Sequence, residues 1–146
     1  MTIAISNQRY YCSSPNPLEG IREFFSSALG TDFVMTKDFL ADLSVPSDYP
    51  EITEDARVYA NSLCQQISLK HSVEPSRVEA SVEGGIAIVY TKKNGFLKKN
   101  YREVFIEVYN DADIAVSYSE NYKVKKVEEV SFDTEKIFND FVARLL

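Results

Sequence analysis

The chain has 146 residues, of which 45% are apolar and 12% aromatic, and its formal net charge is −6 at pH 7. This length and composition are typical of one folded domain and argue against disorder, so we expect a single domain over residues 1–146. The negative charge disfavours attraction of the whole surface to nucleic acid or to acidic membranes.

Targeting and redox signals are sparse in this sequence. The first ten residues lack the basic start and apolar stretch of a secretory signal. No apolar run approaches the roughly 18 residues of a membrane-spanning helix. The two cysteines, Cys12 and Cys64, are too few for a disulfide framework. We therefore expect a cytoplasmic protein with reduced thiols and no membrane association.

Four helices are expected from capping residues and apolar periodicity. A short strand over residues 2–5 precedes the first helix, in which apolar residues recur over 18–29. Thr36 can cap a second, short helix that reaches Leu43. The longest helix follows Thr53 and runs toward His71. A closing helix follows Ser131 or Asp133 as its cap.

From residue 77 the apolar period changes from about 3.6 to 2, which indicates strands. We expect five of them, over residues 77–82, 86–90, 101–109, 114–118 and 122–130. The last strand breaks its alternation between Val124 and Val127, which suggests a bulge or an edge position. Short turns join the strands, so an antiparallel meander is the natural sheet.

The order of these elements predicts an α+β fold with two layers. One face of a meander of about five strands alternates apolar residues and must be covered. The long helix and the C-terminal helix are available to cover it. The opposite face would then carry tyrosines, Phe105 and mixed charges.

A stretch of about a third of the chain resembles a pattern seen in small uncharacterised bacterial proteins. The pattern is a helix and a proline, then a strand, an acidic-Gly-Gly turn and a strand that ends in an aromatic residue, here Pro75, Glu83-Gly84-Gly85 and Tyr90. A third aliphatic strand over 105–108 and an acidic turn over 110–113 follow. Glu83 and Tyr90 stand where those proteins usually have Asp and Trp. The resemblance implies the fold and a bacterial setting, and no activity or functional residue is carried over from it.

Residues that could support catalysis or metal binding are few. His71 is the only histidine, so any nucleophile–histidine arrangement must use it, and a structural role at a helix end is the simpler interpretation. Without a His/Cys cluster, a zinc site is not expected. Asp111 and Asp113 lack the remaining ligands of a calcium loop. We predict no catalytic residue, no metal and no cofactor.

Neither the Gly84-Gly85 pair nor the consecutive glutamates Glu128 and Glu129 indicates a functional site. No helix and no Lys-Ser/Thr pair follows the glycines, so they do not form a phosphate loop. Glu128 and Glu129 should point to opposite faces of a strand, which separates them as an acid/base pair.

Positive charge gathers in one part of the chain. The segment from Lys92 to Lys126 has eight basic and five acidic residues, whereas residues 1–91 and 127–146 carry net charges of −6 and −3. The predicted hairpin tip presents an apolar pair among five basic residues, which we take as candidate partner-binding residues: Lys92, Lys93, Phe96, Leu97, Lys98, Lys99 and Arg102. Lys123, Lys125 and Lys126 would extend this surface if the strands stack in order.

Two explanations fit this basic hairpin. Its lysines could be a solvated surface that prevents aggregation at the sheet periphery. Alternatively, the tip docks an acidic partner, with Phe96 as anchor and the lysines steering the approach.

The leading functional hypothesis is a protein-interaction domain, such as an adaptor, inhibitor or chaperone, without catalysis. The alternative is a small-molecule binder or weak enzyme that uses a cavity between helix and sheet. Nucleic-acid binding through the lysines ranks third. The sequence also slightly favours a homodimer, formed through the tyrosine-rich sheet face or an edge strand.

Overall fold

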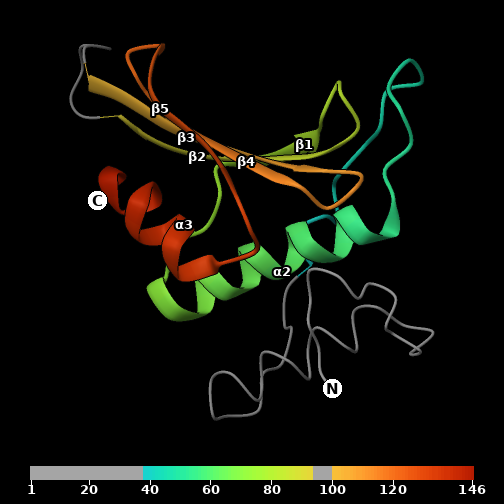
Figure 1. Cartoon of the computed structure of the whole chain (residues 1–146), viewed down its shortest axis with the longest axis horizontal. Helices are drawn as coiled ribbons and strands as arrows, with labels where there is room; N and C mark the ends of the chain where they lie inside the picture. Colours follow the sequence, from blue (N-terminus) through green and yellow to red (C-terminus); the bar gives the residue numbers. More distant parts are fainter. Residues whose placement is uncertain (1–37, 94–99) are drawn as a thin grey trace.

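The computed structural model describes residues 38–93 and 100–146, which form two layers. Five antiparallel strands in the order β1-β2-β3-β4-β5 make one sheet, with bounds β1 Arg77–Ala80, β2 Gly85–Lys93, β3 Tyr101–Tyr109, β4 Ile114–Glu120 and β5 Lys123–Val130. The helices α2 (Glu54–His71) and α3 (Thr134–Asp140), with the 3-10 turn η2 (Val142–Leu145), cover one face of this sheet (Figure 1). The predicted α+β fold with a covered meander is therefore confirmed.

Helix α2 begins where its side-chain cap and a long-range anchor coincide. Thr53 Oγ1 accepts a hydrogen bond from the amide of Ala56 at 3.2 Å, as expected for an N-cap. The same residue is tied to the β3–β4 turn, because Thr53 N donates to Asn110 Oδ1 and Thr53 Oγ1 donates to the Asn110 carbonyl, each at 2.9 Å. The helix ends at Ser72, whose φ of 57° is left-handed. Two sheet-end contacts thus fix where the longest helix starts.

The predicted short helix before α2 is wrong within the described residues. Residues 39–42 form turns. The Asp38 carboxylate accepts from the amide of Leu40 at 2.9 Å, and the amide of Phe39 donates to Asn61 Oδ1 of α2 at 3.0 Å. These two side-chain acceptors hold residues 38–40 in a turn that is anchored to α2. The predicted strand over 2–5 and helix over 18–29 lie outside the described residues.

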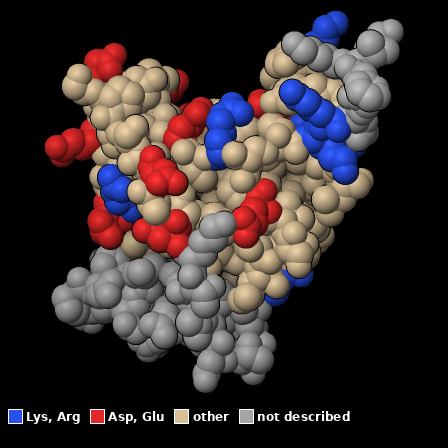
Figure 2. All heavy atoms as spheres, turned by 180° about the vertical axis from the view of Figure 1, so that it is seen from behind, with Lys and Arg blue, Asp and Glu red and all other residues tan. Residues whose placement is uncertain are grey.

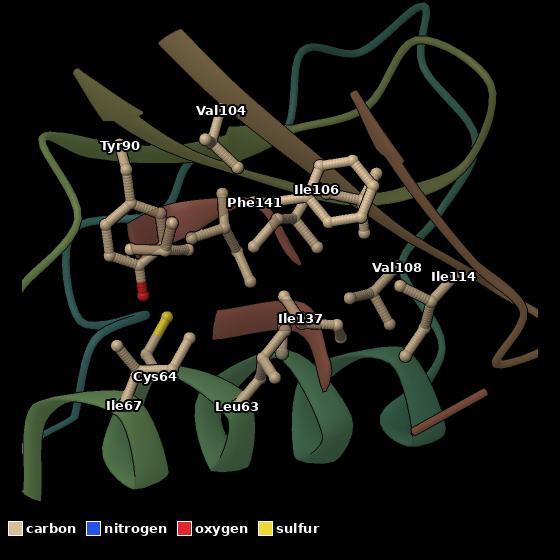
Figure 3. Packing of buried hydrophobic residues seen from close by; sticks show 14 of the residues in the cluster. Leu63, Cys64, Ile67, Tyr90, Val104, Ile106, Val108, Ile114, Ile137 and Phe141 are labelled. Carbon is tan, nitrogen blue, oxygen red and sulfur yellow. The ribbon is translucent and has the colours of Figure 1, made fainter. Parts of the chain in front are cut away.

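Apolar side chains from both layers meet between α2 and the sheet (Figure 3). Fully or almost fully buried members include Leu63, Ile67, Ile88, Ile106, Val108, Ile137 and Phe141. The Tyr90 hydroxyl points toward the Cys64 thiol in this core (Figure 3). Burial, and after it the Cys64 thiol and the Glu74 charge, raises the pKa of Tyr90 well above its ordinary value. Cys64 is thus a core residue, as the sequence predicts.

The closing helix is present but interrupted. The Asp133 carboxylate accepts from the amide of Lys136 at 3.0 Å and caps α3. At Phe141 the backbone leaves helical geometry (φ −128°) and continues as η2. Phe141 itself is fully buried, so the two short pieces still cover the sheet as the predicted single helix would.

Strand β5 has the irregularity that its sequence pattern indicates. Its pairing with β4 shifts register between Tyr118 and Ser119: Tyr118 faces Lys126 whereas Ser119 faces Val124. Lys125 is therefore the extra residue of a β-bulge. The strand order also places β5 at the sheet edge, so both predicted features are confirmed.

The sheet face away from the helices carries a row of three apolar residues and one serine between polar ends. Cross-strand register aligns Val89, Phe105, Ser117 and Val127 across β2 to β5. Tyr101 and Tyr109 share this face with Phe105 because they alternate along β3. Tyr90 and Tyr118, by contrast, are 1% and 3% exposed and belong to the core. The tyrosines are thus divided between the two faces.

Candidate functional site

Three of the predicted partner-binding residues lie together at one end of the sheet. Lys92 and Lys93 end β2, and the register pairs Lys92 with Arg102 and Lys93 with Tyr101 at the start of β3. The other predicted residues, Phe96, Leu97, Lys98 and Lys99, lie outside the described residues.

Arg102 has a structural contact that its sequence position does not reveal. Its Nη1 donates to the carbonyl of Arg144 in η2 at 2.6 Å. Arg102 therefore ties the C-terminal turn to the sheet, and part of its hydrogen-bonding capacity is committed inside the molecule. Lys92 and Lys93, together with Lys123, form no ion pair with any residue in the described ranges.

The β4–β5 hairpin brings further residues to the same end. Register places Lys92, Arg102, Glu120 and Lys123 in one row across four strands. Tyr122, in the hairpin turn, stacks on Tyr101 with ring centroids 5.0 Å apart. We call Lys92, Lys93, Lys123, Tyr101 and Tyr122 the basic end. Figure 2 shows Lys and Arg gathered over this end of the molecule.

The aromatic member of the turn occupies an unfavourable backbone conformation. Asn121 and Tyr122 have φ values of 50° and 69°, which is the pattern of a two-residue type I′ hairpin turn. Glycine is strongly preferred at the second position, whereas Tyr122 is an aromatic residue that is 76% exposed. Its side chain is therefore held in solvent at a cost in backbone strain, which points to a role for the exposed ring.

This strain can be measured by comparing two substitutions. Tyr122→Gly and Tyr122→Ala both remove the stack on Tyr101, but only glycine adopts positive φ without a penalty. We expect the glycine variant to be more stable than the alanine variant by about 1 kcal/mol, as judged from urea unfolding midpoints. An alanine variant as stable as the glycine variant would mean that the turn is not strained.

The opposite end of the sheet is acidic. Glu79, Glu83, Glu107 and Glu129 lie there with the turn residues Asp111 and Asp113. Glu107 accepts hydrogen bonds from the hydroxyls of Ser81 at 2.7 Å and Tyr109 at 3.0 Å. Because both hydroxyls belong to the same chain, the Glu107 carboxylate has a structural role and is not free to act as a general base.

The contact between Tyr109 and Glu107 predicts a raised pKa for the Tyr109 phenol. Burial first, and then the hydrogen bond and charge of Glu107, raise the pKa of Tyr109 to about 12. Since the folded-state pKa exceeds the unfolded one, the associated stability is complete below the unfolded value and is lost as pH rises toward the folded value. The difference between the tyrosinate absorbance titrations of wild type and Tyr109→Phe should have a midpoint near this raised value. A midpoint at the ordinary tyrosine pKa would disprove the contact.

His71 has contacts that fit the structural role predicted for it. Its ring stacks on Phe138 with centroids 3.5 Å apart, and Nε2 lies 3.2 Å from Glu135 Oε1. Both partners belong to α3, so His71 joins the ends of two helices. Glu128 and Glu129 pair with Val116 and Ala115 on opposite faces of the sheet, as the sequence predicts.

Neither a metal cluster nor a membrane-spanning helix is found among the described residues. Within residues 38–93 and 100–146, no cluster of three or more His, Cys, Asp or Glu side chains is placed to hold a metal ion. No helix in the same ranges is long and apolar enough to cross a membrane. Comparison with protein-family models, curated proteins and solved structures finds no match. The basic end is therefore the best-defined candidate site.

Proposed function

We propose that this chain is a cytoplasmic protein-interaction domain that binds an acidic segment of another protein through the basic end, and that it is not an enzyme. The observation that carries the proposal is the stack of the exposed Tyr122 ring on the half-buried Tyr101, with Lys93 paired opposite Tyr101 and Lys123 next to Tyr122 in the chain. Aromatic rings anchor partners at low cost in side-chain entropy, and unpaired charges around them favour association.

The charge distribution supports an acidic partner. The chain is acidic as a whole, so an acidic partner is repelled by most of the surface and attracted at one place. Separation of the basic end from the acidic end would therefore orient the partner before contact. Nucleic acid meets the same repulsion along its regularly charged backbone, which is why we favour a protein segment in which acidic residues flank one apolar side chain.

A displayed peptide library gives the most direct test of this function. Immobilised wild-type protein should enrich acidic peptides that contain an aromatic or aliphatic anchor. The same selection on Tyr122→Ser should lose this enrichment, since the anchor contact is absent. Enrichment of basic or neutral peptides, or equal recovery on both proteins, would contradict the proposal. Tight, salt-sensitive binding of single-stranded oligo-dT in place of peptides would instead favour the nucleic-acid function.

A further inference from the structure

The charges along β5 are complementary to those of a second copy of the strand that runs in the opposite direction. The order of side chains is Lys125, Lys126, Val127, Glu128, Glu129, so bases precede Val127 and acids follow it. The strand is hydrogen-bonded only to β4 among the described residues. Val127 and Val124 are 63% and 61% exposed at this edge.

We infer that two copies of this chain pair through β5 in antiparallel orientation, about a two-fold axis at Val127. In that register Lys126 of one copy lies opposite Glu128 of the other, Lys125 lies near Glu129, and Val127 meets its own copy. Cross-strand pairs of opposite charge stabilise a sheet, and like charges directly opposite destabilise it. The two sheets then continue into one, with both helix layers on the same side.

Neighbouring registers place like charges opposite each other. Moving the axis to Lys126 or to Glu128 places that residue opposite its own copy. Moving the axis to Lys125 places Lys125 opposite its own copy. In-register parallel pairing places each lysine opposite the same lysine of the second copy. The register at Val127 is thus the one among these that has no like charges opposite each other.

Among the described residues, no strand pairs with the outer edge of β5. In the described chain, η2 packs against β2 and β3 rather than beyond β5. The bulge at Lys125 lies to one side of the proposed axis, and Lys126 to Val130 keep regular pairing with β4. Lysines and bulges on an edge strand usually prevent self-pairing, but here the acidic half of the strand complements the basic half.

The dimer is independent of the basic end, because it uses none of the five residues that define that surface. Lys125 and Glu129 are the best pair to test, since neither forms an ion pair within the described residues. Glu128 is less suitable, because it lies 3.4 Å from Lys126 and 3.3 Å from Lys136 of its own chain.

A charge-exchange experiment tests the register. Wild type should sediment as a dimer at high micromolar concentration, while Lys125→Glu alone and Glu129→Lys alone should each dissociate at least about tenfold more readily, because each places two like-charged pairs in the interface. An equimolar mixture of the two variants should recover the dimer, since both pairs are again opposite in charge. This recovery also shows that each variant is folded.

Three results would overturn the inference. A monomeric wild type at the highest soluble concentration would mean that the edge does not self-pair. Dimers that persist in both single variants would place the interface elsewhere. A mixture that stays monomeric would exclude this register. None of these results bears on peptide binding at the basic end.

Discussion

Replacing Gly85 by alanine should destabilise the protein by about 3 kcal/mol or more. Gly85 begins β2 with a φ of 118°, and a Cβ there would lie 2.1 Å from the carbonyl oxygen of Val108 on the paired strand. The new methyl group must therefore displace the β3 backbone where β2 begins, and the alanine must also adopt a conformation that L-residues rarely adopt. Chemical unfolding followed by circular dichroism measures this loss.

Gly84→Ala is the matched control for this substitution. Gly84 also has positive φ, at 97°, but its nearest obstacle is Asn110 Nδ2 at 2.8 Å. A side-chain amide can move, although this one donates to the carbonyl of Glu51. We expect a clearly smaller loss than at Gly85. Equal losses would show that φ alone, and not the close approach of the two strands, sets the requirement for glycine.

Reversing the charge on both hairpins of the basic end should weaken binding of a selected acidic peptide about tenfold or more. The variant Lys93→Glu/Lys123→Glu changes the lysine paired with Tyr101 and the lysine that follows Tyr122. Thermal stability should stay nearly unchanged, because neither lysine has an ion pair within the described residues. Fluorescence anisotropy measures the affinity, and added salt should weaken binding to wild type more than to the variant.

The control for this charge reversal is Arg57→Glu/Lys70→Glu on α2; because Lys70 lies 3.5 Å from Glu135 and loses this ion pair, thermal unfolding must first show that the control variant is folded. It changes the net charge by the same amount on the helix layer rather than at the basic end. If peptide binding depends only on total charge, the two double variants will bind equally weakly, and the basic end would then have no special role.

Much of the fold follows from local sequence signals. The Thr53 cap, the change of period after Pro75 and the turn glycines define α2 and the strands, and short turns leave a meander as the simplest order. The prediction of a short helix before α2 is wrong because the backbone there depends on contacts with distant residues. Phe39 donates to Asn61 of α2, a pairing that no window around residues 39–42 reveals.

The candidate site could be predicted only in part. The clustering of lysines is visible in the sequence, but the register that brings Lys123 into one row with Lys92 and Arg102, with Glu120 between, depends on the pairing of four strands. The contact of Arg102 with the carbonyl of Arg144 spans 42 positions, so its structural role could not be seen. The signal for Tyr122 was present: an Asn followed by an aromatic residue between two strands, where Asn-Gly is usual.

The measurement that tests the central claim most directly is an NMR titration of the isotope-labelled chain with an acidic peptide recovered from the library. Saturable shifts of backbone amides should concentrate at residues 91–93, 101–102 and 120–124, with little change along α2 or at the acidic end. This would place the peptide on the basic end. Shifts centred on α2, on the acidic end or on the core would contradict the account.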